Sequence, residues 1–312
     1  VVLIDRTEAA RRRSVFAPWR VRFERRRSRR TLESNTARVA INVMLEHVWP
    51  QFLHTSALNI LIPNPEWCDH RDRRFLASMS HVWSKTLHSK QIFDALGSRT
   101  QHIGFDSSDR FLAGVHKQRV FLHVAGKSTM KGTSRLVNLW QRRPQWPTLI
   151  IVQHNTINDS PVVAPNIQRI SGYLDDDSLC RLQNSSMFHL CPSQAEGWGH
   201  YIVEALSTAA VVITVDASPM NELVTSSRGL LVPCVAKGMQ NLAYTYDFDE
   251  TELEATIERA IAMNDTECAR LGDAARAWFL ANKKLFPSRL VRAVKHLSAE
   301  RGALARMDTS TT

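Results

Sequence analysis

Residues 191–206 carry the clearest pattern in this 312-residue chain: Cys191-Pro-Ser-Gln-Ala-Glu196-Gly-Trp-Gly-His-Tyr-Ile-Val-Glu204-Ala-Leu206. The apolar run before it, 187–190, predicts a strand, and its two glycines let the loop backbone approach a ligand closely. A helix is expected from about residue 200, with Glu204 one turn inside it. This order is typical of α/β sheets, which bind ligands at the carboxyl ends of strands and at helix N-termini. We therefore predict a polar ligand site that includes Glu196 and Glu204.

Short apolar segments alternate with longer amphipathic segments over most of the chain. The apolar segments are rich in β-branched residues and are bounded by turn-forming residues, which predicts strands. Such strands, separated by helices, form a parallel sheet that is covered on both faces. The predicted fold class is α/β, of the doubly wound kind. Strands are expected over 39–45, 58–62, 119–124, 148–152, 187–190, 211–215 and 229–232, and helices over 133–141, 176–183, 200–208, 220–225 and 251–300.

A second motif, Gly126-Lys127-Ser-Thr-Met-Lys131-Gly132, follows directly after the strand expected over 119–124. A glycine-flanked turn with two cations can neutralise a diphosphate as it departs. The pattern of a Walker phosphate loop is absent. The alternative is a helix-entry loop with two surface lysines.

The motif around Glu196 continues in two further segments, Pro219-Met-Asn-Glu222-Leu-Val and Gly229-Leu-Leu-Val-Pro233. Together they resemble the retaining glycosyltransferases of family 4 (glycosyl transferases group 1), over residues 36–300 and most closely over 119–235. The resemblance implies the GT-B architecture, in which two Rossmann-like domains face each other. It also implies an enzyme that moves a sugar, with retention, from a nucleoside-diphosphate sugar such as a UDP-sugar or GDP-sugar to a hydroxyl acceptor. The acceptor is a glycan, a lipid or a small molecule.

The resemblance also implies roles for single residues. Glu196 would contact the donor sugar and Glu204 the ribose, while the basic loop would stabilise the leaving diphosphate. The family commonly has an Arg and a Lys in that loop, where this chain has two lysines. His47 is the first candidate for a residue near the reacting centre, before His70 and Lys85. The expected donor-binding residues are Gly126, Lys127, Lys131, Ile170, Leu174, Glu196, Gly197, Trp198, Gly199 and Glu204, and the expected catalytic residues are Glu196, Lys131, Lys127 and His47.

No metal and no cofactor other than the donor co-substrate are expected, because GT-B enzymes do not generally need a bound metal for catalysis. The acidic run Asp175–Asp177 is interpreted as a helix start, since acidic residues favour helix N-termini. Three neighbouring carboxylates in one loop do not converge on a cation as a metal site requires.

The chain divides into four predicted parts. The N-terminal domain is predicted to be shortened or divergent, because residues 1–35 contain no glycine and the family has a glycine-rich loop after its first strand. The polar stretch 105–109 is a candidate hinge. The parts are a basic segment (1–35), an N-terminal acceptor domain (36–112), a C-terminal donor domain (113–300) and a tail (301–312).

Positive charge is concentrated at one end of the chain. Residues 1–30 hold eleven arginines and three acidic residues, so they carry eight of the ten net positive charges. Such a segment is either a solvated arm or, through residues 11–30, a peripheral contact with an anionic membrane. No nucleic acid is expected, since few aromatic residues lie among the arginines.

Five widely spaced cysteines make a disulfide framework or a zinc site a poor interpretation. A reducing compartment is expected, so the predicted location is cytoplasmic, with the option of peripheral membrane contact. No leader peptide is expected at the start of this sequence.

Two other functions stay open at this point. One is a catalytically weak subunit with a GT-B fold that binds nucleotide sugars or acts as a scaffold. The other is a sugar-nucleotide epimerase or a phosphorylase on the same architecture.

Overall fold

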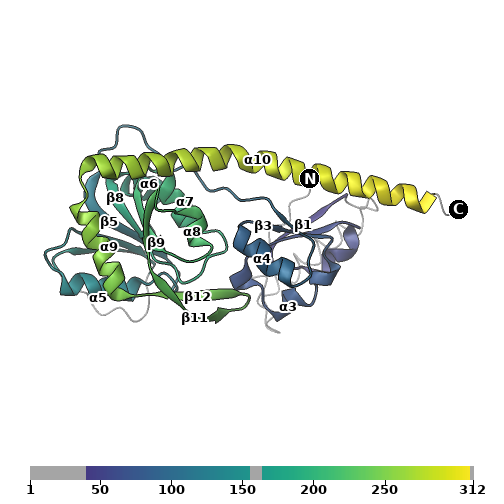
Figure 1. The fold of residues 1–312 in the computed structure, drawn as a ribbon, viewed down its shortest axis with the longest axis horizontal. Coiled ribbons are helices and arrows are strands. Elements are labelled where there is room, and N and C mark those ends of the chain that lie inside the picture. Colours follow the sequence, from purple (N-terminus) through teal and green to yellow (C-terminus); the bar gives the residue numbers. More distant parts are fainter. Residues whose placement is uncertain (1–39, 155–163, 310–312) are drawn as a thin grey trace.

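The computed structural model describes residues 40–154 and 164–309, with side chains up to Ala299. The basic segment 1–35, for which membrane contact is predicted, lies outside these residues. Within them the chain forms two α/β domains side by side (Figure 1). The predicted fold class, a GT-B arrangement of two doubly wound domains, is therefore confirmed.

The N-terminal domain contains a four-stranded parallel sheet in the order β1-β2-β3-β4. Its strands β2 and β3 are fully buried, as expected for a sheet covered on both faces. The strands are β1 (Asn42–Glu46), β2 (Asn59–Pro63), β3 (His81–Ser84) and β4 (Thr100–His102), and the helices are η1 (Pro50–Thr55), η2 (Pro65–Trp67), α3 (His70–Arg73), η3 (Leu76–Ser78) and α4 (Leu87–Ala95).

The C-terminal domain contains a six-stranded parallel sheet in the order β10-β9-β8-β5-β6-β7. The chain adds strands on one side from β5 to β7 and on the other side from β8 to β10, so the order reverses between β5 and β8. The strands are β5 (Gln118–Gly126), β6 (Leu149–Gln153), β7 (Ile167–Ser171), β8 (Ser186–Cys191), β9 (Val211–Val215) and β10 (Gly229–Val232).

Helices α5 to α9 pack around this sheet in the described part of the chain, and its core is apolar and well packed. The rings of Phe121 and Phe188 stack with centroids 4.7 Å apart, and Trp140 packs edge-on against Phe121 at 5.2 Å. All three side chains are fully buried. The helices are α5 (Thr133–Arg142), α6 (Asp176–Ser185), α7 (His200–Ser207), α8 (Met220–Leu223) and α9 (Glu250–Ala262).

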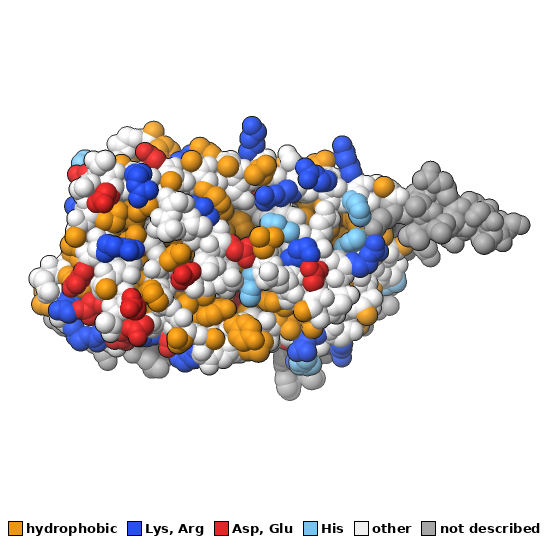
Figure 2. All heavy atoms as spheres, viewed as in Figure 1, with side chains coloured by type: hydrophobic (Ala, Val, Ile, Leu, Met, Phe, Trp, Pro, Cys, Tyr) orange, Lys and Arg blue, Asp and Glu red, His pale blue; other side chains and the backbone are white. Residues whose placement is uncertain are grey.

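The sequence did not predict the antiparallel hairpin of β11 (Cys234–Gln240) and β12 (Ala243–Phe248). It extends from the C-terminal domain toward the N-terminal domain (Figure 1). Several of its hydrophobic side chains are exposed, among them Val235, Met239 and Tyr244. Figure 2 shows hydrophobic side chains along the lower edge of the molecule, where Figure 1 places the hairpin.

The long helix α10 (Asp265–Thr309) runs along both domains (Figure 1). It packs on α7 and β9 in the C-terminal domain. Further along, Ala293 and Leu297 are fully buried in the core of the N-terminal domain, together with Ile60 and Trp83. The helix continues to Thr309, through most of the segment that the sequence predicts as a tail. Among the described residues no helix is long and apolar enough to cross a bilayer.

A carboxylate of the C-terminal domain also caps a helix of the N-terminal domain. Glu222 on α8 accepts hydrogen bonds from the backbone N–H groups of Leu87 (2.8 Å) and His88 (2.7 Å), at the start of α4. A carboxylate at this position satisfies free donors and favours the helix dipole. The domains are therefore joined by polar contacts as well as by α10.

Replacing Leu297 by alanine should destabilise the N-terminal domain more than the C-terminal domain. The change removes a fully buried side chain from the N-terminal core, which typically costs about 2–5 kcal/mol. Hydrogen exchange should therefore quicken in β1–β4 and change little in β5–β10. Val291→Ala, on an exposed position of the same helix, should stay within about 0.5 kcal/mol. Equal loss of protection in both sheets would contradict the conclusion that Leu297 stabilises mainly the N-terminal domain.

Candidate functional site

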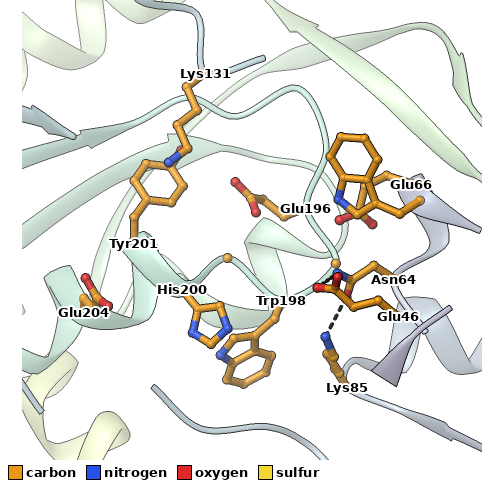
Figure 3. Close-up of a pocket in the computed structure, with 13 residues that line it drawn as sticks. Glu46, Asn64, Glu66, Lys85, Lys131, Glu196, Trp198, His200, Tyr201 and Glu204 are labelled. Carbon is orange, nitrogen blue, oxygen red and sulfur yellow. Dashed lines mark hydrogen bonds between the residues drawn. The ribbon is translucent and has the colours of Figure 1, made fainter. Parts of the chain in front are cut away.

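A pocket of about 300 Å³ lies between the two domains (Figure 3). On the C-terminal side its walls come from the loops that follow β5 and β8, the two strands between which the strand order reverses. Ligands of doubly wound sheets bind at this point, because the two loops diverge and leave a crevice. The lining residues are Glu46, Asn64, Glu66, Trp67, Lys85, Lys131, Glu196, Gly197, Trp198, Gly199, His200, Tyr201 and Glu204.

Glu196 is held by the loop after β8 and keeps part of its surface open to the pocket. Its Oε1 accepts a hydrogen bond of 2.6 Å from the Ser193 hydroxyl, which is also bonded to the Tyr201 hydroxyl. Burial raises the pKa of Glu196, while the Ser193 hydrogen bond and the charge of Lys131 act in the opposite direction. The carboxyl group is therefore fixed by the protein and has acceptor capacity left for a ligand hydroxyl.

The two glycines of the loop allow close approaches. Gly199 lies at φ 84° and precedes the first residue of α7, so the helix N-terminus is exposed to the pocket. A Cβ on Gly197 would lie 2.4 Å from Oδ1 of Asn64, which belongs to the N-terminal domain. A side chain at position 197 would therefore push the two domains apart.

Lys131 lines the pocket together with Glu196 and Glu204, the two glutamates predicted as ligands. Its Nζ donates to the backbone carbonyl of Val124 (3.2 Å) and lies 3.7 Å from the ring centroid of Tyr201. Burial lowers the pKa of Lys131, and the charges of Glu196 and Glu204 oppose that shift. A lysine that lines a pocket can neutralise a diphosphate through its charge and its remaining donors.

Glu204 lies one turn into α7 and is half-buried. One carboxylate oxygen accepts a hydrogen bond of 3.3 Å from the side-chain amide of Gln183. Burial raises the pKa of Glu204, against the effects of Gln183, Arg110 and Lys131. The carboxyl group lines the pocket on the other side of Tyr201 from Glu196 (Figure 3).

The wall contributed by the N-terminal domain is polar and internally bonded. Lys85 Nζ donates to Asn64 Oδ1 (2.7 Å), and Asn64 Nδ2 donates to Glu46 Oε1 (3.1 Å). Burial lowers the pKa of Lys85, while Glu46 and Glu66 raise it. Glu46 has φ 62°, a left-handed conformation that non-glycine residues rarely adopt and that is often found at functional sites.

Glu46, Asn64 and Glu66 were not among the predicted site residues, although they belong to polar stretches at the ends of two predicted strands, 45–50 and 62–67, and Lys85 was ranked low. A signal was available, because Glu46 is the last residue of β1, Asn64 follows β2 and Lys85 follows β3. The carboxyl ends of parallel strands meet at one edge of a sheet, so these three side chains had to lie close together. Two of the three strands were predicted and β3 was not.

The connection between the sheets forms another part of the site. Trp198 Nε1 donates to the hydroxyl of Ser107 (3.0 Å), which is also 2.9 Å from His200 Nδ1. Both aromatic rings meet Phe105 edge-on. The segment proposed as a hinge, 105–109, is therefore bonded to the loop that carries Glu196.

Several predicted site residues lie elsewhere. Lys127 is exposed and does not line the pocket, although it shares a loop with Lys131. Gly126 ends β5 at φ 60°. Ile170 and Leu174 pack against Leu122, Ile150 and Val152 on the sheet.

His47 is buried beside Asp72, with Nδ1 2.8 Å from Oδ2, and does not line the pocket. His70 is exposed at the start of α3. The acidic run behaves as predicted: Asp175 caps α6 by accepting from the Ser178 N–H (2.9 Å). All five cysteines are free thiols.

No family model matches the chain. Its sequence is 29% identical over 126 residues to a GDP-mannose:cellobiosyl-diphosphopolyprenol alpha-mannosyltransferase of Xanthomonas campestris. The matched region covers 36% of this chain and 33% of that enzyme. The chain thus matches about a third of the length of this curated relative.

Solved structures show the fold more fully. A glycosyltransferase from Rickettsia africae ESF-5 superposes with a TM-score of 0.64 at 12% identity, over 96% of this chain and 84% of that one. HepE from Anabaena, in complex with UDP, superposes with a TM-score of 0.62 at 18% identity, over 88% and 81%. The GtfA/B complex superposes with a TM-score of 0.64 at 14% identity, over 86% of this chain and 60% of that one. The chain has the two-domain GT-B fold of these glycosyltransferase structures.

The stability of the protein should fall between pH 5 and pH 8 because of Glu66. Burial, with the charge of Glu196, raises the pKa of Glu66 to about 7, against the opposing effects of Lys85 and the backbone N–H groups of Glu66 and Gly197. The folded state therefore holds this proton more tightly than the unfolded state, and the free energy of unfolding drops as pH rises from 4.5 to 7. The loss should approach about 3 kcal/mol, since one pKa unit corresponds to about 1.4 kcal/mol.

Urea denaturation at pH 5 and pH 8 checks this expectation against Glu66→Gln, which cannot ionise. The wild type should lose stability relative to that variant at pH 8. Glu258→Gln, at an exposed position of α9, should follow the wild type at both pH values. Identical pH profiles for the wild type and Glu66→Gln would be the contrary result.

Proposed function

We propose that the chain is a glycosyltransferase that moves a sugar, with retention, from a nucleoside-diphosphate sugar to a hydroxyl acceptor. The observation that carries this proposal is the grouping of Glu196, Lys131 and Glu204 at the carboxyl ends of β5 and β8, facing the N-terminal domain across one pocket. The similarity to glycosyltransferase structures and to the Xanthomonas enzyme supports it.

In this proposal the donor occupies the C-terminal wall of the pocket. Lys131 and the N-terminus of α7 face the diphosphate, because both supply positive electrostatic potential. Glu196 accepts from the sugar hydroxyls, and Glu204 accepts from the ribose. Lys127 as a second cation, and the backbone near Ile170 and Leu174 as the base site, come from the sequence resemblance.

The reaction breaks the bond between the anomeric carbon and the diphosphate oxygen and forms a bond from that carbon to the acceptor oxygen on the same face. The proton of the acceptor hydroxyl passes to the departing diphosphate. Lys131 stabilises the negative charge that develops there, so the proposal needs no metal ion. His47 enters no step, since its ring is bonded to Asp72 outside the pocket lining.

A cytoplasmic location with peripheral membrane contact through residues 11–30 remains part of the proposal. It rests on the arginine content of that segment. An anionic membrane would also bring the enzyme to a lipid-linked acceptor. The name of the Xanthomonas relative gives such an acceptor, a diphosphopolyprenol, for that protein.

A thermal-shift panel of UDP, GDP, UDP-glucose and GDP-mannose tests the donor site. One of these should raise the unfolding midpoint, because a ligand that binds only the folded state stabilises it by roughly 2.7 kcal/mol at a hundred times its Kd. Glu204→Ala should abolish the shift, and Glu258→Ala should retain it. No shift with any nucleotide, or an equal shift in Glu204→Ala, would overturn the donor-site assignment. A shift without sugar transfer would instead favour a nucleotide-sugar-binding subunit.

The two lysines of the basic loop give a matched pair of variants. Lys131→Ala should lower kcat/KM for the donor by about 10²–10³, the range seen when a donor to a developing charge is removed. Lys127→Ala should lower it less than tenfold, because Lys127 lies in the same loop but is exposed and outside the pocket lining. Initial rates of nucleotide release measure both. Equal losses would show that the loop acts through both cations.

A further inference from the structure

The N-terminal wall of the pocket carries a pair of neighbouring residues, Glu66 and Trp67, that the donor site leaves unused. Both lie in the short helix η2 and both line the pocket. Glu66 is 6% exposed, whereas Trp67 is 51% exposed. A buried carboxyl group and an open aromatic face therefore lie side by side at one pocket.

The Glu66 carboxyl group is incompletely bonded. The backbone N–H of Gly197, across the domain boundary, is one of the groups that stabilise its charged form. Its Oε2 is buried and has no hydrogen-bond partner among the described residues. Buried carboxylate oxygens without a partner are costly, and each calls for an explanation. A ligand hydroxyl in the pocket would supply the missing donor.

Trp67 adds a flat apolar surface next to that acceptor. The face of an indole ring carries negative potential and favours contact with positively polarised edges. The C–H groups on one face of a pyranose ring are such edges, and the hydroxyl groups at its rim need acceptors. A carboxyl oxygen beside an exposed indole thus matches a sugar ring better than an alkyl chain.

The rest of this wall also disfavours a long apolar ligand. Glu46, Asn64 and Lys85 line it and are joined by hydrogen bonds. An acyl chain placed there would remove water from charged groups without replacing its hydrogen bonds.

The hairpin β11–β12 of the C-terminal domain holds this pair in position. Asn241 Nδ2 donates to the backbone carbonyl of Glu66 (2.7 Å), and the Leu242 N–H donates to the carbonyl of Pro65 (3.1 Å). Leu242 also packs against the N-terminal cluster that contains Cys68. The pair is thereby fixed relative to Glu196, which lies across the pocket (Figure 3).

We propose that Glu66 and Trp67 form a carbohydrate subsite that binds a pyranose ring of the acceptor, with Glu66 accepting from a ring hydroxyl and Trp67 stacking on the ring face. This inference rests on the proposed function and narrows its acceptor to a glycan or glycoconjugate. Alkyl alcohols and peptide hydroxyls are the competing acceptor classes.

Binding of the full chain to an array of pyranose-terminated glycans tests the subsite without requiring turnover. The wild type should bind a subset of these glycans, and Trp67→Ala should weaken that binding about tenfold or more, as truncation of a central aromatic contact does. Trp67→Phe should retain most of the affinity because it keeps a ring. At pH 8, above the pKa of about 7 of Glu66, Glu66→Gln should weaken binding several-fold, since a charge-assisted hydrogen bond is replaced by a neutral one. Phe111→Ala, at an exposed aromatic outside the pocket lining, should bind as the wild type does.

The nucleotide shift separates this inference from the donor site. Trp67→Ala should keep the nucleotide-induced rise of the unfolding midpoint and lose most of its glycan binding. Glu204→Ala should lose that rise and keep glycan binding. Absence of glycan binding by a protein that binds nucleotide would overturn the subsite alone, as would unchanged binding by Trp67→Ala. Transfer of the donor sugar to octanol or to a serine peptide, with no transfer to pyranosides, would also overturn the carbohydrate subsite.

Discussion

Parallel pairing between β5 and β8 is the constraint on which the site depends. Strands are added outward from this pair in both directions, so the loops after β5 and β8 leave the sheet on diverging paths. The first loop carries Lys131 and the second carries Glu196. Helix α7, which follows the second loop, carries Glu204. A register shift of one residue in either strand would move its phenylalanine to the opposite face of the sheet and break the stack of Phe121 on Phe188, because side chains alternate along a strand. The packing of these two rings therefore also sets where the charged groups meet.

The sequence predicted the C-terminal half of this arrangement well and the N-terminal half poorly. Strands such as 211–215 are uniformly apolar and short, and the fold places β9 at those same residues. By contrast β3, His81–Ser84, contains polar residues that are nevertheless fully buried, so its composition does not reveal a strand. The partner of His47 is Asp72, 25 residues away, and only the folded chain brings them together. The hairpin β11–β12 escaped prediction because most of its residues are exposed or half-buried, so burial imposes no regular apolar pattern on its sequence.

The two domains are joined through contacts of different kinds, all close to the pocket or to α10. Asn64 meets Gly197 directly, Glu222 caps α4, and the hairpin tip holds the segment that contains Glu66. Each contact joins a residue at the carboxyl edge of one sheet to the other domain. Ionic and hydrogen-bonded contacts of this kind are weaker than a large apolar interface, so relative motion of the domains is compatible with the fold.

Helix α10 has a consequence for how the protein is made. Ala293 and Leu297 complete a core whose other members, including Ile60 and Trp83, are synthesised some two hundred residues earlier. Domains usually fold in order as the chain leaves the ribosome, and contacts distant in sequence slow that process. Here the first domain lacks part of its core until the last helix emerges. The C-terminal domain, although translated second, holds most of its own core before that point, so the nascent chain should acquire stable structure in the reverse of its sequence order.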